Sequence, residues 1–427
     1  MENQAKAGPR VVIVGAGFGG LEAAKHLGNE PVWVSVIDRT NHHLFQPLLY
    51  QVATAALSPA DIAAPVRGVL GRYENIEVIL AEVEAVEIET RRVRTREREF
   101  EYEYLVLATG ARHSYFGHDE WEKIAPGLKS LEDAVEIRRR ILLAFEFAEK
   151  TDDPEARAAA MNFVVIGGGP TGVEMAGAIA EIARETLAKD FRHIDPSTAR
   201  VILVEGDKRV LSAYPEDLSL SALRQLQELG VEVITGSHAT NLTENGLEVA
   251  GKIIPCRVKI WAAGNVASFV GKTLGVPVDR AGRVIVQDDL TIPGHPEVQV
   301  IGDLANFTAT KDGKPLPGIS PVAIQQGRHA AKNILHMITG ARPQRFYYWD
   351  KGSMATIGRN RAVADLNFIH FSGLLAWLAW LFVHVLYLVG FRNRIAVLFQ
   401  WAWAYVTFNK GARLITRNFQ AEQRPMG

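Results

Sequence analysis

Cysteine is almost absent from this sequence. Cys256 is the single thiol among 427 residues. One thiol cannot form an internal disulfide, a Cys-x-x-Cys redox pair or a cysteine metal cluster. Histidine does not fill the gap, because the adjacent His42 and His43 would point to opposite faces of a strand. We therefore expect no metal site, and no protein dithiol that carries electrons.

An excess of charge of one sign is also missing. The net charge is −1, which gives no reason to expect nucleic acid as a partner. Residues 1–10 are polar and lack a signal-peptide pattern, so we expect a reduced, cytoplasm-facing location. The length allows two or three domains. The hydrophobic content of 48% is at the upper end of the soluble range and suggests an apolar segment.

Glycine, in contrast, is concentrated in two loops, of which the first is Gly15-Ala16-Gly17-Phe18-Gly19-Gly20. It follows the apolar run 11–14 and precedes the helix-like segment 21–27. Such glycines permit a tight turn and a close approach to a pyrophosphate, which the free N–H groups of the helix N-terminus can bind. Asp38 stands where the acidic residue that binds a ribose hydroxyl is expected, about 20 residues further on. The loop therefore predicts a dinucleotide site.

The second loop is Gly167-Gly168-Gly169-Pro170-Thr171-Gly172. It follows the apolar run 163–166 and opens a helix-like stretch from 173 to about 190. The next strand-like run, 200–204, ends in Glu205, whose carboxylate would accept hydrogen bonds from a ribose diol and repel a 2′-phosphate. This favours NAD(H) over NADP(H).

Two basic residues near Glu205 weaken this preference. Lys208 and Arg209 could contact a phosphate, although such residues more often cap a loop.

The order of these patterns predicts an α/β fold with two Rossmann-like dinucleotide-binding domains and a C-terminal helical membrane-attachment segment. Residues 76–88 and 92–104 are expected to form an inserted antiparallel piece, and 124–150 and 321–338 to contain helices. The expected domains are a discontinuous first domain (1–115 and 286–345), a second domain (116–285) and a C-terminal region (346–427).

The C-terminal region is strongly apolar. Residues 371–391 are 21 residues without Asp, Glu, Lys or Arg. At about 1.5 Å per residue, a helix of that length can cross a bilayer core. A second apolar piece covers 395–408. A transmembrane span is therefore one interpretation, and a buried dimer interface is another.

Attachment to one leaflet is the interpretation we favour. Aromatic residues recur at steps of three and four, so they share a helix face that suits the headgroup boundary. A basic face would suit anionic lipid. The aromatic set is Trp377, Trp380, His384, Tyr387 and Phe391, and the basic set is Lys410, Arg413 and Arg417.

Taken together, these motifs resemble type II (non-proton-pumping) NADH:quinone oxidoreductases, within the flavoproteins that have two dinucleotide-binding domains. One departure is that the family's Ala-Gln-x-Ala-x-Gln-Gln pattern is Ser320-Pro321-Val322-Ala323-Ile324-Gln325-Gln326 here, without the first glutamine, which bears on the quinone contacts. The segments that carry the resemblance are both glycine loops, 41–54, Ala108-Thr109-Gly110, Trp261-Ala262-Ala263-Gly264, Ile301-Gly302-Asp303, Gln325-Gln326-Gly327 and 350–356.

The resemblance implies that the first domain binds FAD and the second binds NADH. The FAD residues it implies are Gly15, Gly17, Phe18, Gly19, Gly20, Asp38, Arg39, Gln46, Val83, Ala108, Thr109, Gly110, Asp303 and Ala323. The NADH residues are Gly167, Gly169, Pro170, Thr171, Gly172, Glu174, Glu205, Ala263 and Gly264. Gln325, Gln326 and Lys351 would contact the quinone, and Glu174, Gln325 and Lys351 are the candidate catalytic residues.

Three of these residues have a simpler interpretation. Asp303 could cap a following helix. Glu174 could be a carboxylate stabilised by a helix N-terminus. Lys351 could be a solvated surface lysine.

The implied function is respiratory-chain electron transport from NADH to a membrane quinone without proton pumping. The location would be the cytoplasmic face of the cell membrane, or the mitochondrial inner membrane in a eukaryote. A tail-mediated homodimer is a further expectation. The missing dithiol argues against the disulfide reductases and the sulfide:quinone reductases of the same superfamily. The alternatives are a soluble-type NADH-dependent reductase of a protein electron carrier and a nucleotide-sensing flavoprotein.

Overall fold

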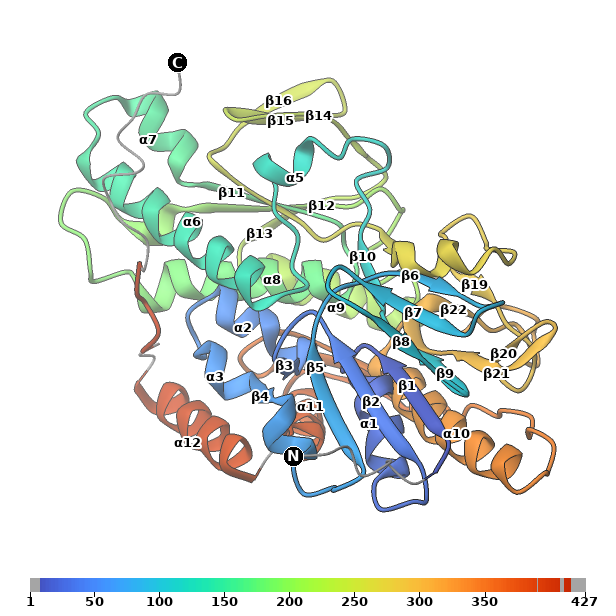
Figure 1. The fold of residues 1–427 in the computed structure, drawn as a ribbon. Helices are drawn as coiled ribbons and strands as arrows, with labels where there is room; N and C mark the ends of the chain where they lie inside the picture. The colour runs from blue at the N-terminus through green and yellow to red at the C-terminus, as the bar shows by residue number, and fades with distance from the viewer. Residues whose placement is uncertain (1–7, 390, 408–410, 416–427) are drawn as a thin grey trace. The chain divides into compact units, whose positions relative to one another are not determined.

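The computed structural model describes residues 8–389, 391–407 and 411–415, with only the backbone at 391–393 and 403–407 (Figure 1). The chain divides into two compact units. The first comprises Met1–Leu44, Ala63–His113 and Asn265–Lys351, and the second Phe45–Ile62, Ser114–Gly264 and Gly352–Gly427. This is a different division from the domain ranges expected from the sequence, which stay a prediction.

The first unit is built on a six-stranded sheet in the order β20–β21–β9–β1–β2–β5. The strands are parallel except for the pairing of β20 with β21. In chain order the five parallel strands give the doubly wound arrangement, in which the strand order reverses beside β1. The bounds are β1 Arg10–Val14, β2 Trp33–Asp38, β5 Ile76–Leu80, β9 Tyr104–Leu107, β20 Thr291–Ile292 and β21 His295–Val300.

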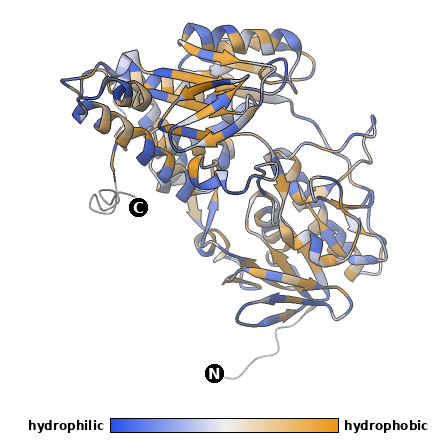
Figure 2. Ribbon diagram, turned by 90° about the horizontal axis from the view of Figure 1, so that it is seen from above, coloured by the Kyte–Doolittle hydropathy of each residue, from blue (hydrophilic) through white to orange (hydrophobic). Residues whose placement is uncertain are grey.

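Central strands such as β1 and β9 are continuous apolar runs because both faces of a parallel sheet are buried. Long hydrophobic stretches are visible in the strands of Figure 2. Helices α1 (Phe18–Leu27) and α10 (Ser320–Ile338) pack on each other. They meet at Gly327, where an added Cβ would lie 2.1 Å from the Gly19 carbonyl oxygen.

The expected antiparallel piece is partly wrong. Ile76–Leu80 is the edge strand β5 of the parallel sheet and pairs with β2, and the antiparallel sheet begins only at β6. An edge strand is half exposed, so it can carry a charged residue such as Glu77 among its apolar ones, as an antiparallel strand does. The smaller elements of this unit are β3 His42–Leu44, β4 Ala63–Pro65, α4 Val66–Leu70, β6 Val83–Glu87, β7 Arg92–Thr95, β8 Glu99–Glu101, β10 Ala111–His113, β18 Asn265–Ala267, η4 Phe269–Leu274, β19 Val284–Ile285, η5 Gly302–Leu304 and β22 Ala305–Asn306.

The second unit repeats the design with a four-stranded parallel sheet in the order β13–β12–β11–β17. Relative to chain order this is again 3-2-1-4, with the reversal beside the first strand. An antiparallel sheet, β14–β15–β16, belongs to the same unit. The strands are β11 Asn162–Ile166, β12 Arg200–Val204, β13 Val231–Ile234, β14 Ala239–Thr243, β15 Gly246–Val249, β16 Lys252–Pro255 and β17 Val258–Trp261.

Helix α8 (Pro170–Glu181) follows the second glycine loop and continues as one π-helical segment, Ile182–Thr186, so it ends before the expected position near 190. Helix α6 (Leu131–Lys150) begins at a capping box, in which the Asp133 N–H donates to Ser130 and the Ser130 N–H donates to Asp133. The other helical elements are η1 Gln46–Leu48, α2 Leu49–Ala53, α3 Pro59–Ile62, α5 Trp121–Ile124, α7 Pro154–Ala160, η3 Pro196–Thr198 and α9 Glu216–Glu228.

The last part of the chain belongs to the second unit. Strands β23 (Ser353–Gly358), β24 (Arg361–Asp365) and β25 (His370–Ser372) form a sheet, and α11 (Leu374–Tyr387) and α12 (Phe391–Thr407) follow. Strand β23 crosses α8 at Gly177, where an added Cβ would lie 1.7 Å from the Ile357 carbonyl oxygen. Over the described part of the chain, no helix combines the length and apolar character needed to span a membrane.

Candidate active site

The first glycine loop connects β1 to α1, as expected. Gly15 has φ of 98°, and an added Cβ would lie 2.4 Å from the Ala108 carbonyl oxygen, so both conformation and space require glycine there. Helix α1 begins after Gly17 without a side-chain cap. Its first N–H groups are therefore available to an anion.

Asp38 ends β2 and faces this loop. Its carboxylate accepts hydrogen bonds from the Ala16 N–H at 2.6 Å and from the Thr40 N–H and hydroxyl at 2.7 and 2.8 Å. These contacts hold the carboxylate beside the start of α1, where a ribose hydroxyl is bound in this fold. Neighbouring Arg39 is exposed.

Small residues line the other side of the loop. Ala108, Thr109 and Gly110 follow β9, the strand beside β1 on the side where the order reverses. The Thr109 hydroxyl is buried, and among the described residues it has no hydrogen-bond partner. A buried polar group of this kind indicates that a ligand or water completes the site.

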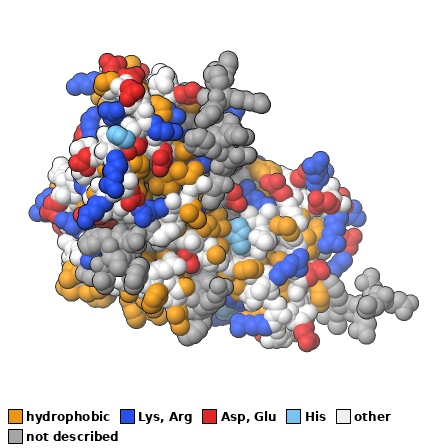
Figure 3. Space-filling model, turned by 90° about the vertical axis from the view of Figure 1, so that its left-hand side faces the viewer, with side chains coloured by type: hydrophobic (Ala, Val, Ile, Leu, Met, Phe, Trp, Pro, Cys, Tyr) orange, Lys and Arg blue, Asp and Glu red, His pale blue; other side chains and the backbone are white. Residues whose placement is uncertain are grey.

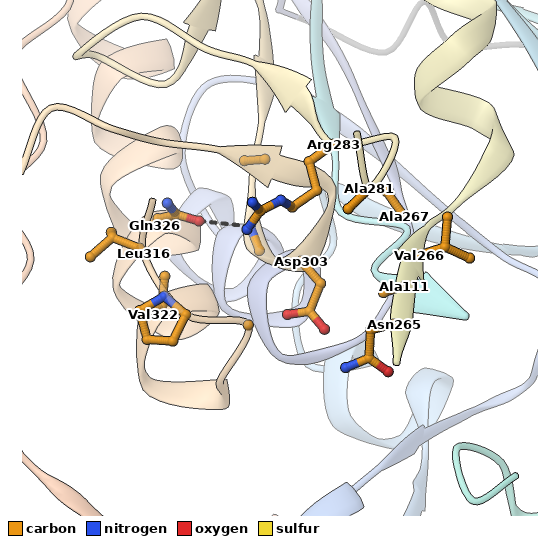
Figure 4. A pocket seen from close by; sticks show the side chains of 14 residues that line it. Ala111, Asn265, Val266, Ala267, Ala281, Arg283, Asp303, Leu316, Val322 and Gln326 are labelled. Carbon is orange, nitrogen blue, oxygen red and sulfur yellow. Dashed lines mark hydrogen bonds between the residues drawn. The ribbon is translucent and has the colours of Figure 1, made fainter. Parts of the chain in front are cut away.

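A cavity of about 210 Å³ opens in the first unit between the turn 302–303, the start of α10 and β18. Figure 4 shows the Asp303 carboxylate pointing into it, toward the side of Asn265. The turn is fixed by Gln326, whose buried side-chain oxygen accepts the Gly302 N–H at 2.7 Å. Asp303 lies in the one-turn segment Gly302–Leu304, whereas α10 begins at Ser320 after Ile319. Asp303 therefore does not cap α10, and its carboxylate faces the cavity.

Gln325 and Lys351 have a shared partner. The Gln325 amide donates to the Trp349 carbonyl at 2.9 Å and accepts from the Trp349 N–H at 3.0 Å. The Lys351 ammonium lies 5.3 Å from the centre of the Trp349 ring. Gln325 thus fixes the backbone of the segment that carries Lys351.

The remaining FAD candidates lie as follows. Phe18 packs edge-on against buried His43, whose Nδ1 lies 3.0 Å from the Ala16 carbonyl oxygen. Val83 and Ala323 are buried in the first unit. Gln46 belongs to the second unit, is exposed and donates to the Lys129 carbonyl at 3.2 Å.

The second glycine loop connects β11 to α8 in the same way. Gly167 has φ of 111°, and an added Cβ would lie 2.7 Å from the Ala262 carbonyl oxygen. Pro170 is the first residue of α8, where its missing N–H costs no helical hydrogen bond. Ala263 and Gly264 follow β17, the strand beside β11 on the side of the reversal.

Glu205 ends β12 and occupies the place that Asp38 has in the first unit. Its carboxylate accepts hydrogen bonds from the Gly168 N–H and, at 2.7 Å, from the Asp207 N–H. Arg209 donates to the Ser212 carbonyl at 3.1 Å, which is the loop-capping role considered above.

Glu174 lies in α8, four residues after its first residue. Its side chain is partly exposed, but burial among the surrounding protein raises its pKa to about 8. A hydrogen bond from the Thr356 backbone N–H of β23 acts in the opposite direction and is the smaller effect. At neutral pH the carboxyl is therefore protonated. This disagrees with the interpretation of Glu174 as a carboxylate kept charged by the helix N-terminus.

Tyr50 and Gln51 are not among the site residues predicted from the sequence, although they lie in the segment 41–54 that carries the resemblance. Tyr50 is buried, and its pKa is raised well above the usual value by burial and by the nearby Glu174. The sequence shows two polar residues in this segment but not that they are buried. In the structure, every residue of α2 is buried. That burial is decided by tertiary contacts.

The aromatic set of α11 is only partly exposed, since Tyr387 is 37% exposed and Trp377 is half-buried, whereas two members turn inward. Trp380 is buried and His384 stacks on it with ring centres 4.2 Å apart, and Tyr50 and Phe45 also contact this pair. Burial lowers the pKa of His384 to about 4. The most exposed apolar side chains of α11 are those of Leu374, Leu375, Leu378, Phe382 and Leu386. Periodicity identified a shared face but could not decide which face is buried.

The expected basic face is only partly described. Arg413 lies outside regular secondary structure and forms an ion pair with Asp190. Lys410 and Arg417, together with the side chains of Phe391, Trp403 and Tyr405, lie outside what the structure describes. Within the described ranges, no group of three or more His, Cys, Asp or Glu residues could hold a metal ion.

Comparison with known proteins places these features in a family. Residues 9–327 match the family Pyridine nucleotide-disulphide oxidoreductase, and residues 350–407 match the NDH2 C-terminal domain. The chain is 45% identical to the Type II NADH:quinone oxidoreductase NdhA of Mycobacterium tuberculosis, over 95% of this chain and 89% of that protein. It is 44% identical to Type II NADH:quinone oxidoreductase Ndh of the same organism, over 95% and 90%.

A solved structure shares the fold. NDH2 from Plasmodium falciparum in complex with NADH aligns with a TM-score of 0.87 at 18% identity, over 96% of this chain and 100% of that chain. At this identity the likeness is one of fold.

Proposed function

This chain belongs to the type II NADH:quinone oxidoreductase family, and from that membership we propose that its first glycine loop holds FAD and its second holds NADH. Its activity is electron transfer from NADH to a quinone. The observation that supports two nucleotide sites is the pair of matched loops. In each loop, the N–H of the second residue donates a hydrogen bond to a carboxylate at the end of the next strand of the sheet.

Four features of the first unit fit FAD. The N–H groups at the start of α1 suit a pyrophosphate. Asp38 is held where its carboxylate would accept a hydrogen bond from an adenosine ribose hydroxyl. Asp303, in the cavity of about 210 Å³, would bind the ribityl hydroxyls, and the buried Thr109 hydroxyl would gain the partner it lacks. When bound, FAD supplies the redox chemistry, taking two electrons from NADH and passing them to the quinone.

In the second unit, Glu205 would bind the ribose of NADH, and the N-terminus of α8 its pyrophosphate. The same carboxylate would repel the 2′-phosphate of NADPH. Pro170, Thr171 and Gly172 shape the start of that helix, while Ala263 and Gly264 allow close approach on the other side.

Glu174 would hold the proton that the reaction requires. NADH brings two electrons and one proton, whereas the reduction of a quinone to a quinol takes up two electrons and two protons. One further proton is therefore needed in each turnover. A carboxyl with a pKa of about 8 carries a proton at neutral pH and can release it, which is the property of a general acid.

Gln325, Gln326 and Lys351 are proposed to shape the quinone approach. Gln326 would act by fixing the turn that carries Asp303. Gln325 would act by fixing the backbone at Trp349, so that Trp349 and Lys351 can contact the head group. Trp349 is 73% exposed, which suits contact with a large apolar substrate.

Helices α11 and α12 are proposed to attach the enzyme to one leaflet of the cell membrane, on its cytoplasmic face. Leu375, Phe382 and Phe399 are each more than 60% exposed. Figure 3 shows hydrophobic side chains gathered along the lower edge of one face of the molecule. Such an exposed patch suits burial in the acyl boundary. A homodimer stays a prediction that sedimentation velocity in detergent checks.

An anaerobic NADH titration tests the assignment. NADH should bleach the flavin absorbance of the purified holoenzyme, and a water-soluble quinone should restore it. Bleaching without restoration by quinone would favour the reductase of a protein carrier. Protein that stays colourless after incubation with FAD would contradict the proposal.

A further inference from the structure

Helix α12 has two distinct faces. Ile395, Leu398, Phe399 and Ala402 are exposed and recur at steps of three and four, which makes one apolar stripe. On the other side, Val397 is fully buried and Trp401 turns inward. The helix therefore presents one face to its surroundings and uses the other to contact the body of the second unit.

The inward contact includes a specific hydrogen bond. The Trp401 indole Nε1–H donates to the Gln51 side-chain oxygen at 2.7 Å. An indole can only donate, so it selects the oxygen of the Gln51 amide. The amide nitrogen is then directed to the other side, where it donates to the Tyr50 hydroxyl at 2.9 Å. Contact with Trp401 thus fixes the orientation of Gln51 toward Tyr50.

Tyr50 is the link to Glu174. Its hydroxyl oxygen accepts from Gln51, so its own proton is free to be directed elsewhere. Burial and the proximity of Glu174 keep this hydroxyl protonated. Helix α2, which carries Tyr50 and Gln51, packs on α8, which carries Glu174. The Tyr50 ring is also packed against Trp380 of α11, with ring centres 6.5 Å apart.

We propose that the hydrogen-bond chain Trp401–Gln51–Tyr50 couples lipid contact by α12 to the quinone half-reaction. Gln51 is a positioning residue, because its amide is oriented by Trp401 and donates in turn to the Tyr50 hydroxyl, on the helix that packs against α8. A lipid surface that covers the apolar stripe stabilises the seated helix, since four exposed apolar side chains leave water together. The inference rests on the proposed role of Glu174 as proton source.

The test uses the full-length holoenzyme, a short-chain water-soluble quinone, and vesicles of phosphatidylethanolamine and phosphatidylglycerol. Three quantities are measured for wild type, Trp401→Phe and Gln51→Leu: steady-state quinone reduction with and without vesicles, flavin reduction by NADH under anaerobic conditions, and co-sedimentation with the vesicles. Phenylalanine keeps an aromatic ring at 401 but removes the N–H.

We expect vesicles to stimulate quinone reduction by wild type. Both variants should lose this stimulation, with kcat in the presence of vesicles reduced by about three- to tenfold, as for the loss of one buried hydrogen bond. Flavin reduction by NADH and co-sedimentation should stay at the wild-type level. The matched control is Trp33→Phe, which removes an indole hydrogen bond to Glu77 in the other unit and should leave the stimulation intact.

Wild-type stimulation in both Trp401→Phe and Gln51→Leu would overturn the proposal. Loss of co-sedimentation together with loss of stimulation would also overturn it, because Trp401 would then act only in attachment. Glu174→Gln separates this outcome from a failure of the proposed function. If Glu174→Gln reduces quinone at the wild-type rate while Trp401→Phe does not, the proton source is misassigned but the coupling from α12 to the quinone step remains.

Discussion

The two nucleotide loops are nearly identical in construction, but the elements that cover the helices behind them differ. In the first unit α10 crosses α1 at Gly327, and its Gln326 fixes the turn that carries Asp303. In the second unit β23 crosses α8 at Gly177, and its Thr356 N–H contacts Glu174. The same loop is thus combined with a fixed cavity in one unit and with a protonated acid in the other.

This difference suggests why one nucleotide would be retained and the other exchanged. A site fixed by a buried glutamine and enclosed by a long helix loses little freedom when its ligand binds, which favours tight retention. The second loop offers the same anion contacts without an equivalent of Gln326. Five predictions test this contrast.

The largest effects are expected from closing each loop in turn. An added Cβ would lie 1.8 Å from the Gly15 carbonyl oxygen at Gly20, and 1.7 Å from the Gly167 carbonyl oxygen at Gly172. Gly20→Ala should purify without flavin. Gly172→Ala should retain flavin but raise the KM for NADH roughly 100-fold, equivalent to about 2.7 kcal/mol of binding. Flavin absorbance and steady-state kinetics measure both, with circular dichroism to verify folding. If Gly172→Ala lost flavin and Gly20→Ala retained it with a raised KM for NADH, the two cofactors would be assigned to the wrong loops.

The crossing points come next. Gly327→Ala and Gly177→Ala both force apart two backbones in contact, which costs about 1–3 kcal/mol and lowers Tm by roughly 2–10 °C. Gly327→Ala should also release flavin on dilution, whereas Gly177→Ala should slow quinone reduction while flavin is retained. Thermal unfolding and flavin release measure the two effects. If both variants lost flavin equally, the proposed difference in flavin retention between the two units would be contradicted.

A pH profile tests the acid. Glu174 loses its proton as pH rises through about 8, so wild-type quinone reduction should slow above that pH, by about tenfold per pH unit if this proton limits the rate. Glu174→Gln should be slower and should lack this decline, whereas flavin reduction by NADH should be unaffected. A decline that persists in Glu174→Gln would assign it to another group.

The same shift has a consequence for stability. The folded state keeps the Glu174 proton that the unfolded state releases above the ordinary pKa of 4.5. Glu174 therefore destabilises the fold increasingly as pH rises from 4.5 to about 8, and Glu174→Gln should remove that part of the pH dependence.

The smallest effect is expected for coenzyme selectivity. Glu205→Ala should reduce the preference for NADH over NADPH about tenfold, because the repulsion of a 2′-phosphate is lost. Asp38→Ala should leave that ratio unchanged, although it should weaken the retention of flavin. Equal ratios of kcat/KM for the two coenzymes in wild type and Glu205→Ala would contradict the proposed role of Glu205.

The sequence was sufficient where structure is determined locally. A glycine loop, the strand before it, the helix after it and the acid on the next strand all follow from short-range patterns, and Asp38 and Glu205 lie where those patterns predicted. The doubly wound order of each sheet follows from right-handed crossovers between parallel strands.

The sequence was insufficient where distant segments meet. Thr356 contacts Glu174 from another element. Trp349 accepts a hydrogen bond from the Gln325 amide, 24 positions earlier in the chain. Trp401 donates to Gln51, which is 350 positions earlier. The inward position of two members of the aromatic set of α11 was missed for a related reason. Trp380 and His384 are covered by α2 and its neighbours, and the hydrophobic period of one helix contains no information on what will cover it.

Cys256 gives the second unit a built-in reporter. The thiol is fully buried in the core formed with Leu247 and Trp261, and burial raises its pKa. A maleimide dye can therefore react only when this core opens. Because the chain has no other sulfhydryl, the labelling rate of the unmodified enzyme measures how often the unit opens, and protection by NADH would measure how firmly the coenzyme holds it shut.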